Sequence, residues 1–303
     1  IRAYLAGRFD SSRLKRWLFS SWVTLYGQIG GKIFTGIDIL LLGLLGSRNI
    51  GSYSVAETIS STITSARGLS YALYPKLLKT ESRNKGDIEK TMSLLLMFLV
   101  PMTVGCILLS PNLIEMFGSK YLSGLVPLQI LVASECINVA GAVDRFIALG
   151  GERIDEKEVT VRGMLKSKIF LIESVAYIGT FVAIPITVLL VPQYDITGAA
   201  MAILASQTVT SLIEMLSTRF AGLRALPKEK ILKFIIASCV MSLVIVFFYS
   251  KGTLKTLILI AASIAVYFST LTLIDRDTRF LGKAVINEIR GTIKRVRWSS
   301  STT

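Results

Sequence analysis

The sequence contains no histidine, and only three of its 303 residues are cysteine. The absence of histidine excludes histidine-based acid–base chemistry and histidine metal sites. Cys106, Cys136 and Cys239 lie far apart in apolar runs, which favours small core residues over disulfides or metal ligands. We therefore expect neither a metal nor a cofactor.

Sequence motifs of common enzyme classes are also missing. The segment YGQIGGKI (26–33) resembles a phosphate-binding loop only superficially, because Tyr26 occupies the first glycine position and Ile33 replaces the Ser or Thr. There is no HExxH motif and no nucleotide-binding domain. A membrane glycosyltransferase would place acidic residues in a sizeable external loop, whereas the expected external loops offer only Glu115 and Asp195. We expect a protein that is not an enzyme.

Apolar residues are abundant: 52% of the chain is hydrophobic and the mean hydropathy is +0.60. This composition is too apolar for a soluble domain and is typical of a multispanning membrane protein. In a soluble protein, 34 Lys and Arg against 20 Asp and Glu would indicate nucleic-acid binding. Here an uneven distribution of basic loops across a membrane explains the excess better. The expected partner is the lipid bilayer and not nucleic acid.

Eight segments are long and apolar enough to cross a bilayer. Their expected bounds are 17–45, 51–75, 91–110, 125–149, 169–191, 196–218, 234–250 and 254–274. The first six carry the charges and the Gly, Pro, Ser and Thr residues, whereas the last two carry almost none. The sequence therefore predicts an all-α integral membrane protein with a six-helix lobe (17–218) and two accessory helices (234–274).

Basic residues concentrate on one side of these eight spans. The segments on that side contain 27 Lys and Arg, against 4 in the connections on the other side. They are the N-terminal segment 1–16, the loops 76–90, 150–168 and 219–233, and the tail 275–303. Because cytoplasmic loops carry the excess of Lys and Arg, both termini are expected in the cytoplasm.

The second span combines a glutamate and an arginine with many hydroxyl groups. On a helix its polar residues fall on one side, spaced by three and four: Glu57, Ser60, Ser61, Thr64, Arg67, Gly68 and Tyr71. Each ion near a bilayer centre costs on the order of 3 kcal/mol, so this stripe should face protein or water. Arg67 is deep and has no acid one turn away on its own helix. Its guanidinium suits a phosphate or carboxylate ligand, and an interhelical ion pair is the alternative.

Other charges within the spans allow several roles. Asp38 and Glu57 lie at similar depth on consecutive antiparallel spans, where two close carboxylates can share a proton or bind a cation. The alternative is that one of them caps a helix or pairs with a base. Lys32 and Glu135 lie near mid-depth and are expected to form a structural ion pair. Four more ionisable residues lie near cytoplasmic ends, where a structural role is expected: Asp144, Arg145, Glu173 and Glu214.

Two stretches resemble a known family. They are IDILLLGLLGSRNIGSYSVAETISS (37–61), continuing to YALYPKL (71–77), and VPMTVGCILLSPNLIEMFGSKYLSGLVPLQIL (100–131). Both are similar to the second half of polysaccharide flippases, the O-antigen and lipid-linked oligosaccharide transporters of the superfamily that includes the multidrug and toxin extruders. The resemblance covers roughly 17–218 and contains no catalytic signature.

The resemblance implies a fold of two six-helix lobes, followed by two extra helices. This chain would then be the second lobe with the extra pair, and its partner would be a missing N-terminal six-helix lobe. It also implies alternating access and a pyrophosphate-linked glycan substrate, in a prokaryotic plasma membrane. Substrate contacts are expected from Arg67, Lys32, Ser60, Thr64 and Tyr71. Coupling to H⁺ or Na⁺ is expected at Asp38 or Glu57.

Two other functions remain compatible with the sequence. The first is a multidrug-type exporter of small cationic or drug-like solutes, which a cavity dominated by acids would favour; the deep Arg67 favours an anionic substrate instead. The second is a membrane subunit of envelope polysaccharide assembly that does not itself transport.

Overall fold

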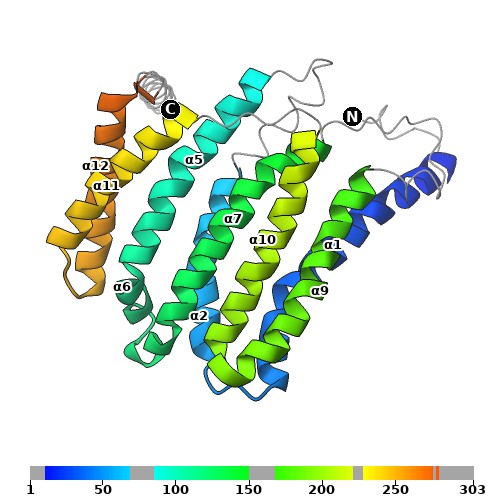
Figure 1. Ribbon diagram of the computed structural model, residues 1–303, viewed down its shortest axis with the longest axis horizontal. Coiled ribbons are helices and arrows are strands. Elements are labelled where there is room, and N and C mark those ends of the chain that lie inside the picture. Colours follow the sequence, from blue (N-terminus) through cyan, green and yellow to red (C-terminus); the bar gives the residue numbers. More distant parts are fainter. Residues whose placement is uncertain (1–10, 69–84, 150–167, 221–227, 276–277, 280–303) are drawn as a thin grey trace, which may run out of the picture.

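The computed structural model describes residues 11–68, 85–149, 168–220, 228–275 and 278–279. Within these ranges the chain forms helices and no strand (Figure 1). The α-helices are α1 (Ser11–Leu44), α2 (Ile50–Ser60), α5 (Lys85–Leu108), α6 (Ser110–Glu115), α7 (Leu125–Leu149), α9 (Lys168–Tyr194), α10 (Ile196–Phe220), α11 (Lys228–Phe247) and α12 (Thr253–Ile274). Two 3₁₀ helices complete the set: η2 (Ser61–Arg67) and η3 (Ser119–Gly124).

Seven helices in the described part of the chain are long and apolar enough to cross a membrane: α1, α5, α7, α9, α10, α11 and α12. A helix satisfies its own backbone hydrogen bonds, which is what an apolar solvent requires. The prediction of a helical, multi-pass membrane protein is thus confirmed. The remaining expected span, 51–75, begins as α2 and continues as η2, and its residues 69–75 lie outside the described ranges. The count of eight spans stays a prediction.

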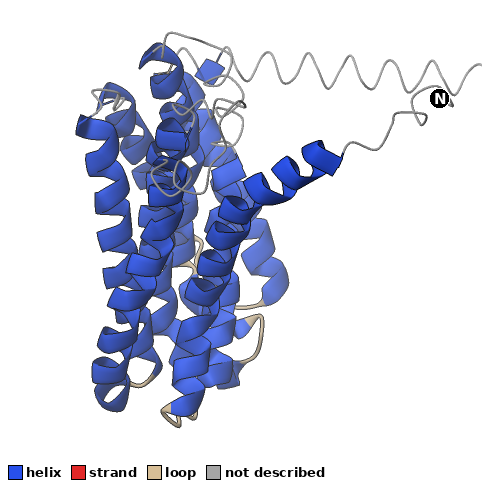
Figure 2. Ribbon diagram, turned by 90° about the vertical axis from the view of Figure 1, so that its right-hand side faces the viewer, coloured by secondary structure: helices blue, strands red, loops and turns tan. Residues whose placement is uncertain are grey.

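The helices stand side by side in a fixed order. In the view of Figure 1, α11 and α12 lie at one side next to α5, and α7, α10 and α9 follow toward α1. α2 and η2 pack against α7, behind it in this view. Figure 2 shows the N-terminal part of α1 leaning away from the other helices.

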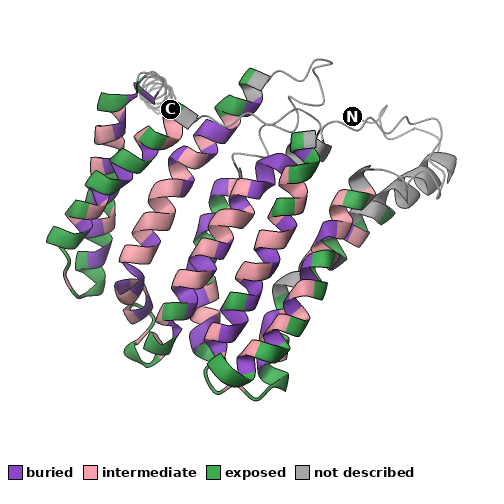
Figure 3. Cartoon of the chain, viewed as in Figure 1, coloured by how far each residue is buried: buried purple, intermediate pink, exposed green. Residues whose placement is uncertain are grey.

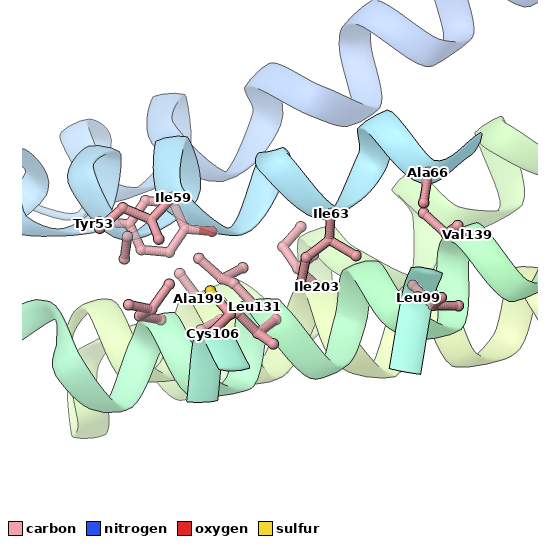
Figure 4. Close-up of a cluster of buried hydrophobic side chains, with 14 of the residues drawn as sticks. Tyr53, Ile59, Ile63, Ala66, Leu99, Cys106, Leu131, Val139, Ala199 and Ile203 are labelled. Atoms are coloured by element: carbon pink, nitrogen blue, oxygen red, sulfur yellow. The ribbon is translucent and has the colours of Figure 1, made fainter. Parts of the chain in front are cut away.

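Two clusters of buried apolar side chains correspond to this arrangement. The larger cluster joins α2 and η2 to α5, α7 and α10. In Figure 4, Tyr53, Ile59 and Ile63 from α2 and η2 point toward α7 and α10, which contribute Leu131 and Ile203. The smaller cluster joins α11 and α12 to α5. Because lipid tails are as apolar as these side chains, close packing rather than exclusion of water holds the helices together.

The outward surfaces are apolar, as expected of helices that face lipid. Figure 3 shows exposed residues running along the outer sides of α11 and α12. Leu243 and Phe247 of α11 and Leu254 and Ile258 of α12 are among the exposed large hydrophobic residues.

A proline inside α5 creates a contact with α12. Pro101 has no N–H, so the carbonyl of Met97, four residues earlier, has no donor within the helix. The Tyr267 hydroxyl of α12 donates a hydrogen bond to that carbonyl at 2.8 Å. Since the Tyr267 side chain is buried, this bond ties α12 to the centre of α5.

Candidate functional site

A cavity of about 300 Å³ lies among α1, α2, η2, α7, α9 and α10. Its ionisable lining residues are Asp38, Glu57, Arg67, Glu135, Arg145 and Glu214. Four of these are carboxylates and two are guanidiniums. On α7 the lining runs from Leu131 to Arg145, which corresponds to roughly 21 Å along a helix axis. The cavity therefore extends over much of a hydrocarbon layer about 30 Å thick.

Helical periodicity explains why polar residues gather here. On α10, the polar residues Gln207, Thr210, Ser211 and Glu214 recur at intervals of three and four, so they share one side of the helix. Ser60, Ser61, Thr64 and Arg67 follow the same rule on α2 and η2. Glu135, Asn138 and Arg145 of α7 complete the polar lining between these two stripes.

Asp38 and Tyr53 hold one end of the cavity together. The Tyr53 hydroxyl donates a hydrogen bond to Asp38 Oδ2 at 2.5 Å, and the Ile39 backbone N–H donates to Asp38 Oδ1 at 2.8 Å. Asp38 is on α1 and Tyr53 on α2, so this bond links two helices that otherwise touch little. Both side chains are buried, and Asp38 is only 5% exposed. Its carboxylate is thus fixed in place while still lining the cavity.

Glu57 lies on α2 at the same end of the cavity. Its carboxylate has no hydrogen bond or ion pair to any described residue, although it lies within electrostatic reach of Asp38 and Glu135. Asp38 and Glu57 thus line one cavity, and their ion-coupling role stays a prediction.

A hydrogen-bonded chain crosses the middle of the cavity. Arg67 Nη2 donates to Asn138 Oδ1 at 2.5 Å, and Asn138 Nδ2 donates to Glu135 Oε2 at 3.1 Å. Thr64 Oγ1 also approaches Glu135 Oε2, at 3.4 Å. Asn138 therefore bridges the guanidinium and the carboxylate, which do not touch directly. Arg67 Nε is buried and has no hydrogen-bond partner in the described structure.

The opposite end of the cavity contains a direct ion pair. Arg145 Nη2 of α7 lies 2.7 Å from Glu173 Oε2 of α9. Glu214 of α10 lines the cavity nearby, within electrostatic reach of both Arg145 and Arg67. These residues were expected to have structural roles near cytoplasmic helix ends. The structure places Arg145 and Glu214 on the cavity wall, and their structural role stays a prediction.

Most of the expected site residues lie around this cavity. Ser60, Thr64 and Arg67 line it, as do Asp38 and Glu57.

The remaining expectations concern Lys32, Glu135 and Tyr71. Lys32 is exposed on α1, next to the lining residue Gly31, and is not among the lining residues. Glu135 accepts hydrogen bonds from Thr64 and Asn138 in the structure. The pairing of Lys32 with Glu135 stays a prediction. Tyr71 lies outside the described residues.

Several lining residues were not anticipated: Asn138, Arg145, Gln207, Thr210, Ser211 and Glu214. The signal for those on α10 was present in the run SQTVTSLIE (206–214), where polar residues recur with helical spacing in an apolar span. Asn138 gives no such signal, since a single amide in a span is unremarkable without knowledge of its neighbours.

No family model, curated protein or solved structure matches the chain. Its function is therefore inferred from the cavity and from the resemblance described above.

Proposed function

We propose that this chain is the second lobe of an ion-coupled flippase, which moves a lipid-linked oligosaccharide or polysaccharide precursor to the outer leaflet of a prokaryotic plasma membrane. The observation that carries the proposal is the charged cavity enclosed by membrane-spanning helices. Charged groups within a membrane are expensive and mark the paths of ions or substrates. The resemblance to the polysaccharide flippases supplies the class of substrate.

The size of the cavity supports separate routes through the lobe for the coupling ion and for the saccharide. At about 300 Å³ it is at the small end of ligand pockets, which suits an ion with its waters rather than an oligosaccharide on a lipid. The saccharide would instead pass along the polar face formed by Thr58, Ser61, Thr62 and Ser65, which are exposed on α2 and η2. Their hydroxyls donate to carbonyls of their own helix, so the hydroxyl oxygens remain able to accept hydrogen bonds from a saccharide.

The cavity and the polar face of α2 and η2 meet at Ser61 and Arg67. Ser61 is exposed on the polar face and also lines the cavity, so the cavity opens toward that face. Arg67 lies on the cavity wall with an unpartnered Nε, and its guanidinium would meet the pyrophosphate of a substrate. In this proposal a first lobe outside this chain covers the polar face, and rocking of the two lobes gives alternating access.

A second candidate, a cation-coupled exporter of small cationic solutes, is favoured by one observation. Four carboxylates line the cavity against two guanidiniums, and an acidic cavity attracts cations. The two candidates differ in where the acids act: on the coupling ion in a flippase, or on the transported solute in an exporter.

The test is transport by this chain reconstituted together with its first lobe, in vesicles loaded with fluorescent undecaprenyl- or dolichyl-linked oligosaccharide. We expect flipping that depends on an H⁺ or Na⁺ gradient, and we expect Arg67→Gln to abolish it because the substrate loses a charged, bidentate partner. Arg48→Gln is the matched control, since Arg48 is exposed in the loop after α1 and does not line the cavity.

Three other outcomes would count against this assignment. Unchanged flipping by Arg67→Gln would remove Arg67 from the substrate site. Gradient-driven export of a cationic dye without flipping would favour the second candidate. Neither activity would favour a subunit of polysaccharide assembly that does not transport.

A further inference from the structure

The charges around the cavity do not cancel. Arg145 is paired with Glu173 at 2.7 Å, and Arg67 is joined to Glu135 through Asn138. These contacts use both guanidiniums of the wall. The other carboxylates on it, Asp38, Glu57 and Glu214, have no cationic partner among the described hydrogen bonds and ion pairs. Carboxylates without a cationic partner are costly in a membrane interior, so the uptake of positive charge would stabilise this wall.

Glu214 is separated from the other two unmatched carboxylates. Asp38 and Glu57 share the end near the loop between α1 and α2, whereas Glu214 lies near Arg145 at the opposite end. The carboxylate of Glu214 packs against Gly141 of α7: a Cβ at Gly141 would lie 3.3 Å from Glu214 Oε2 and 2.9 Å from Ser211 Oγ. Its carboxylate has no hydrogen bond to a described residue.

Charged groups face Glu214 from every neighbouring element. They are Asp144 and Arg145 of α7, Arg67 of η2 and Glu173 of α9. A proton and a bound Na⁺ each cancel one negative charge, and the two arginines oppose both, so charge does not separate them. The two ions differ in the ligands that they need: a metal ion takes several oxygen ligands, and the described residues contain no group of three or more acidic side chains that could hold one, whereas a proton needs a single carboxylate oxygen. The surroundings of Glu214 therefore favour a proton over a metal ion.

Unpartnered donors on the same wall indicate that water fills the space between these acids. Gln207 is only 8% exposed and lies two helical turns from Glu214 on α10; its Oε1 accepts from Thr210 at 3.4 Å, and its amide nitrogen donates to no described group. Arg67 Nε is buried without an acceptor. Buried donors of this kind are normally satisfied by ordered water. At about 30 Å³ for each water, the cavity holds on the order of ten.

We infer that Glu214 is a proton-binding site, and that it forms one end of a water-filled proton path through the lobe whose other end is Asp38 and Glu57. This inference rests on the proposed function, for which it names the coupling ion. A hydronium in the cavity gives its proton to a Glu214 carboxylate oxygen, which leaves a water molecule and a neutral acid. On release, the proton returns to water at the Arg145 end.

Infrared difference spectroscopy of the purified protein tests the site without any transport assay. Lowering the pH should produce the carbonyl-stretch bands of protonated carboxylic acids, and Glu214→Gln should remove one component of them, the Glu214 band. Vesicles holding a pH-sensitive dye provide the second measurement. There, Glu214→Gln should abolish the change in internal pH that accompanies flipping, and flipping of the labelled oligosaccharide should fall to the rate seen without a gradient.

Asp144→Asn is the matched control. Asp144 is also buried near this end of α7, but its carboxylate accepts a hydrogen bond from Thr218 Oγ1 at 2.6 Å and does not line the cavity. Asp144→Asn should keep the infrared band that Glu214→Gln loses, and its flipping should still respond to the gradient. If Glu214→Gln elutes as an aggregate, Gly141→Ala replaces it: the new methyl group presses on Glu214 and should shift the same band.

The outcomes separate this inference from the proposed function. A difference spectrum that neither Glu214→Gln nor Gly141→Ala changes overturns the proton site even if flipping is observed. A band lost in Glu214→Gln but kept in Asp144→Asn supports the proton site, even in vesicles where no oligosaccharide is flipped. In that case only the substrate assignment fails.

Discussion

Asp275 closes α12 and ties it to α11. Lys233 Nζ lies 2.9 Å from Asp275 Oδ1, and the backbone N–H and hydroxyl of Thr278 donate to Oδ2 at 3.0 and 2.8 Å. Burial by itself would raise the pKa of Asp275, but the hydrogen bonds from Lys233 and Thr278 outweigh burial and lower it from 3.8. The charged form is thus the stabilising one.

Replacing Asp275 by Asn should destabilise the α11–α12 pair by on the order of 1 kcal/mol at neutral pH. Because the pKa is lowered in the folded state, this contribution is full above about pH 4 and is lost as the pH falls through the folded value. Thermal unfolding in detergent should therefore show a Tm gap between wild type and Asp275→Asn that closes below pH 4. A gap that is equal at pH 3 and pH 7 would contradict the assignment.

Asn138 shows what the sequence could not reveal about single residues. Arg67 looked isolated because no acid lies one turn away on its own helix. Its partner, Glu135, comes from α7 through Asn138, and this contact depends on the register between η2 and α7. Periodicity along one helix predicts which residues share a side, as it did for Ser60, Thr64 and Arg67. It contains no information on how far that helix slides along its neighbour.

Glycines set the distance between α1 and α9. A Cβ on Gly27 would collide with the Glu173 side chain, and one on Gly30 would lie 2.5 Å from the ring of Tyr177. Tyr177 cannot retreat easily, because its ring stacks on Tyr26 at 4.5 Å and its hydroxyl donates to the Tyr26 carbonyl at 2.8 Å. Small residues at such positions allow helices to approach closely in a membrane.

The substitution Gly30→Ala should force α1 away from α9 and cost about 1–3 kcal/mol, the usual range for overpacking. Gly36→Ala on the same helix is the control, because a Cβ at Gly36 would meet open space. It should be neutral or stabilise the helix by about 0.5–1 kcal/mol. Unfolding in detergent measures both, and equal Tm values for the two variants would refute this account of the α1–α9 contact.

The span 51–75 shows how far periodicity predicts an element. A regular helix was expected, and the structure has α2 followed by the 3₁₀ helix η2. Here the Ser and Thr run supplies the physical cause: Ser61, Thr62 and Ser65 donate their hydroxyls to carbonyls three residues earlier. Local hydroxyl bonds of this kind compete with regular α-helical hydrogen bonding. Whether an α-helix or a 3₁₀ helix forms then depends on packing, which the sequence alone does not specify.

At the scale of the whole molecule, the charge distribution predicts an orientation. The loop 45–49, the α9–α10 junction at Asp195 and the turn after α11 lie at one end of the bundle (Figure 1), and Asn49 Nδ2 donates to Asp195 Oδ2 across it at 2.7 Å. The positive-inside rule assigns this end to the exterior. The Asp38–Glu57 end of the cavity then faces outward, and the Arg145 end faces the cytoplasm.

A thiol label tests this orientation. In a cysteine-free background, Arg48→Cys should react with a membrane-impermeant maleimide in intact cells, because residue 48 is exposed in the loop 45–49. Gly86→Cys near the start of α5, also exposed, should react only after the cells are permeabilised. The reverse labelling pattern would show that the protein has the opposite orientation in the membrane. The Arg145 end of the proton path would then face outward.

The fold class followed from composition and run length, because a bilayer admits few solutions for so apolar a chain. How the helices group was predicted less fully. The low charge of the last two spans marked them as different, and α11 and α12 do form a separate apolar cluster with α5. That α5 contributes to both clusters was not foreseeable, since Tyr267 reaches the free carbonyl beside Pro101 only through the tertiary arrangement.

The seven-residue helix η2 begins four residues after Glu57 and ends at Arg67, so its winding sets where Arg67 lies relative to Glu57. A 3₁₀ helix rises about 2.0 Å and turns about 120° for each residue, against about 1.5 Å and 100° in an α-helix. Rewinding η2 as α-helix would draw Arg67 about 3.5 Å toward Glu57 and swing it through about 140°. One local change of winding would carry the guanidinium off the cavity wall, break its contact with Asn138 and leave Glu135 unmatched.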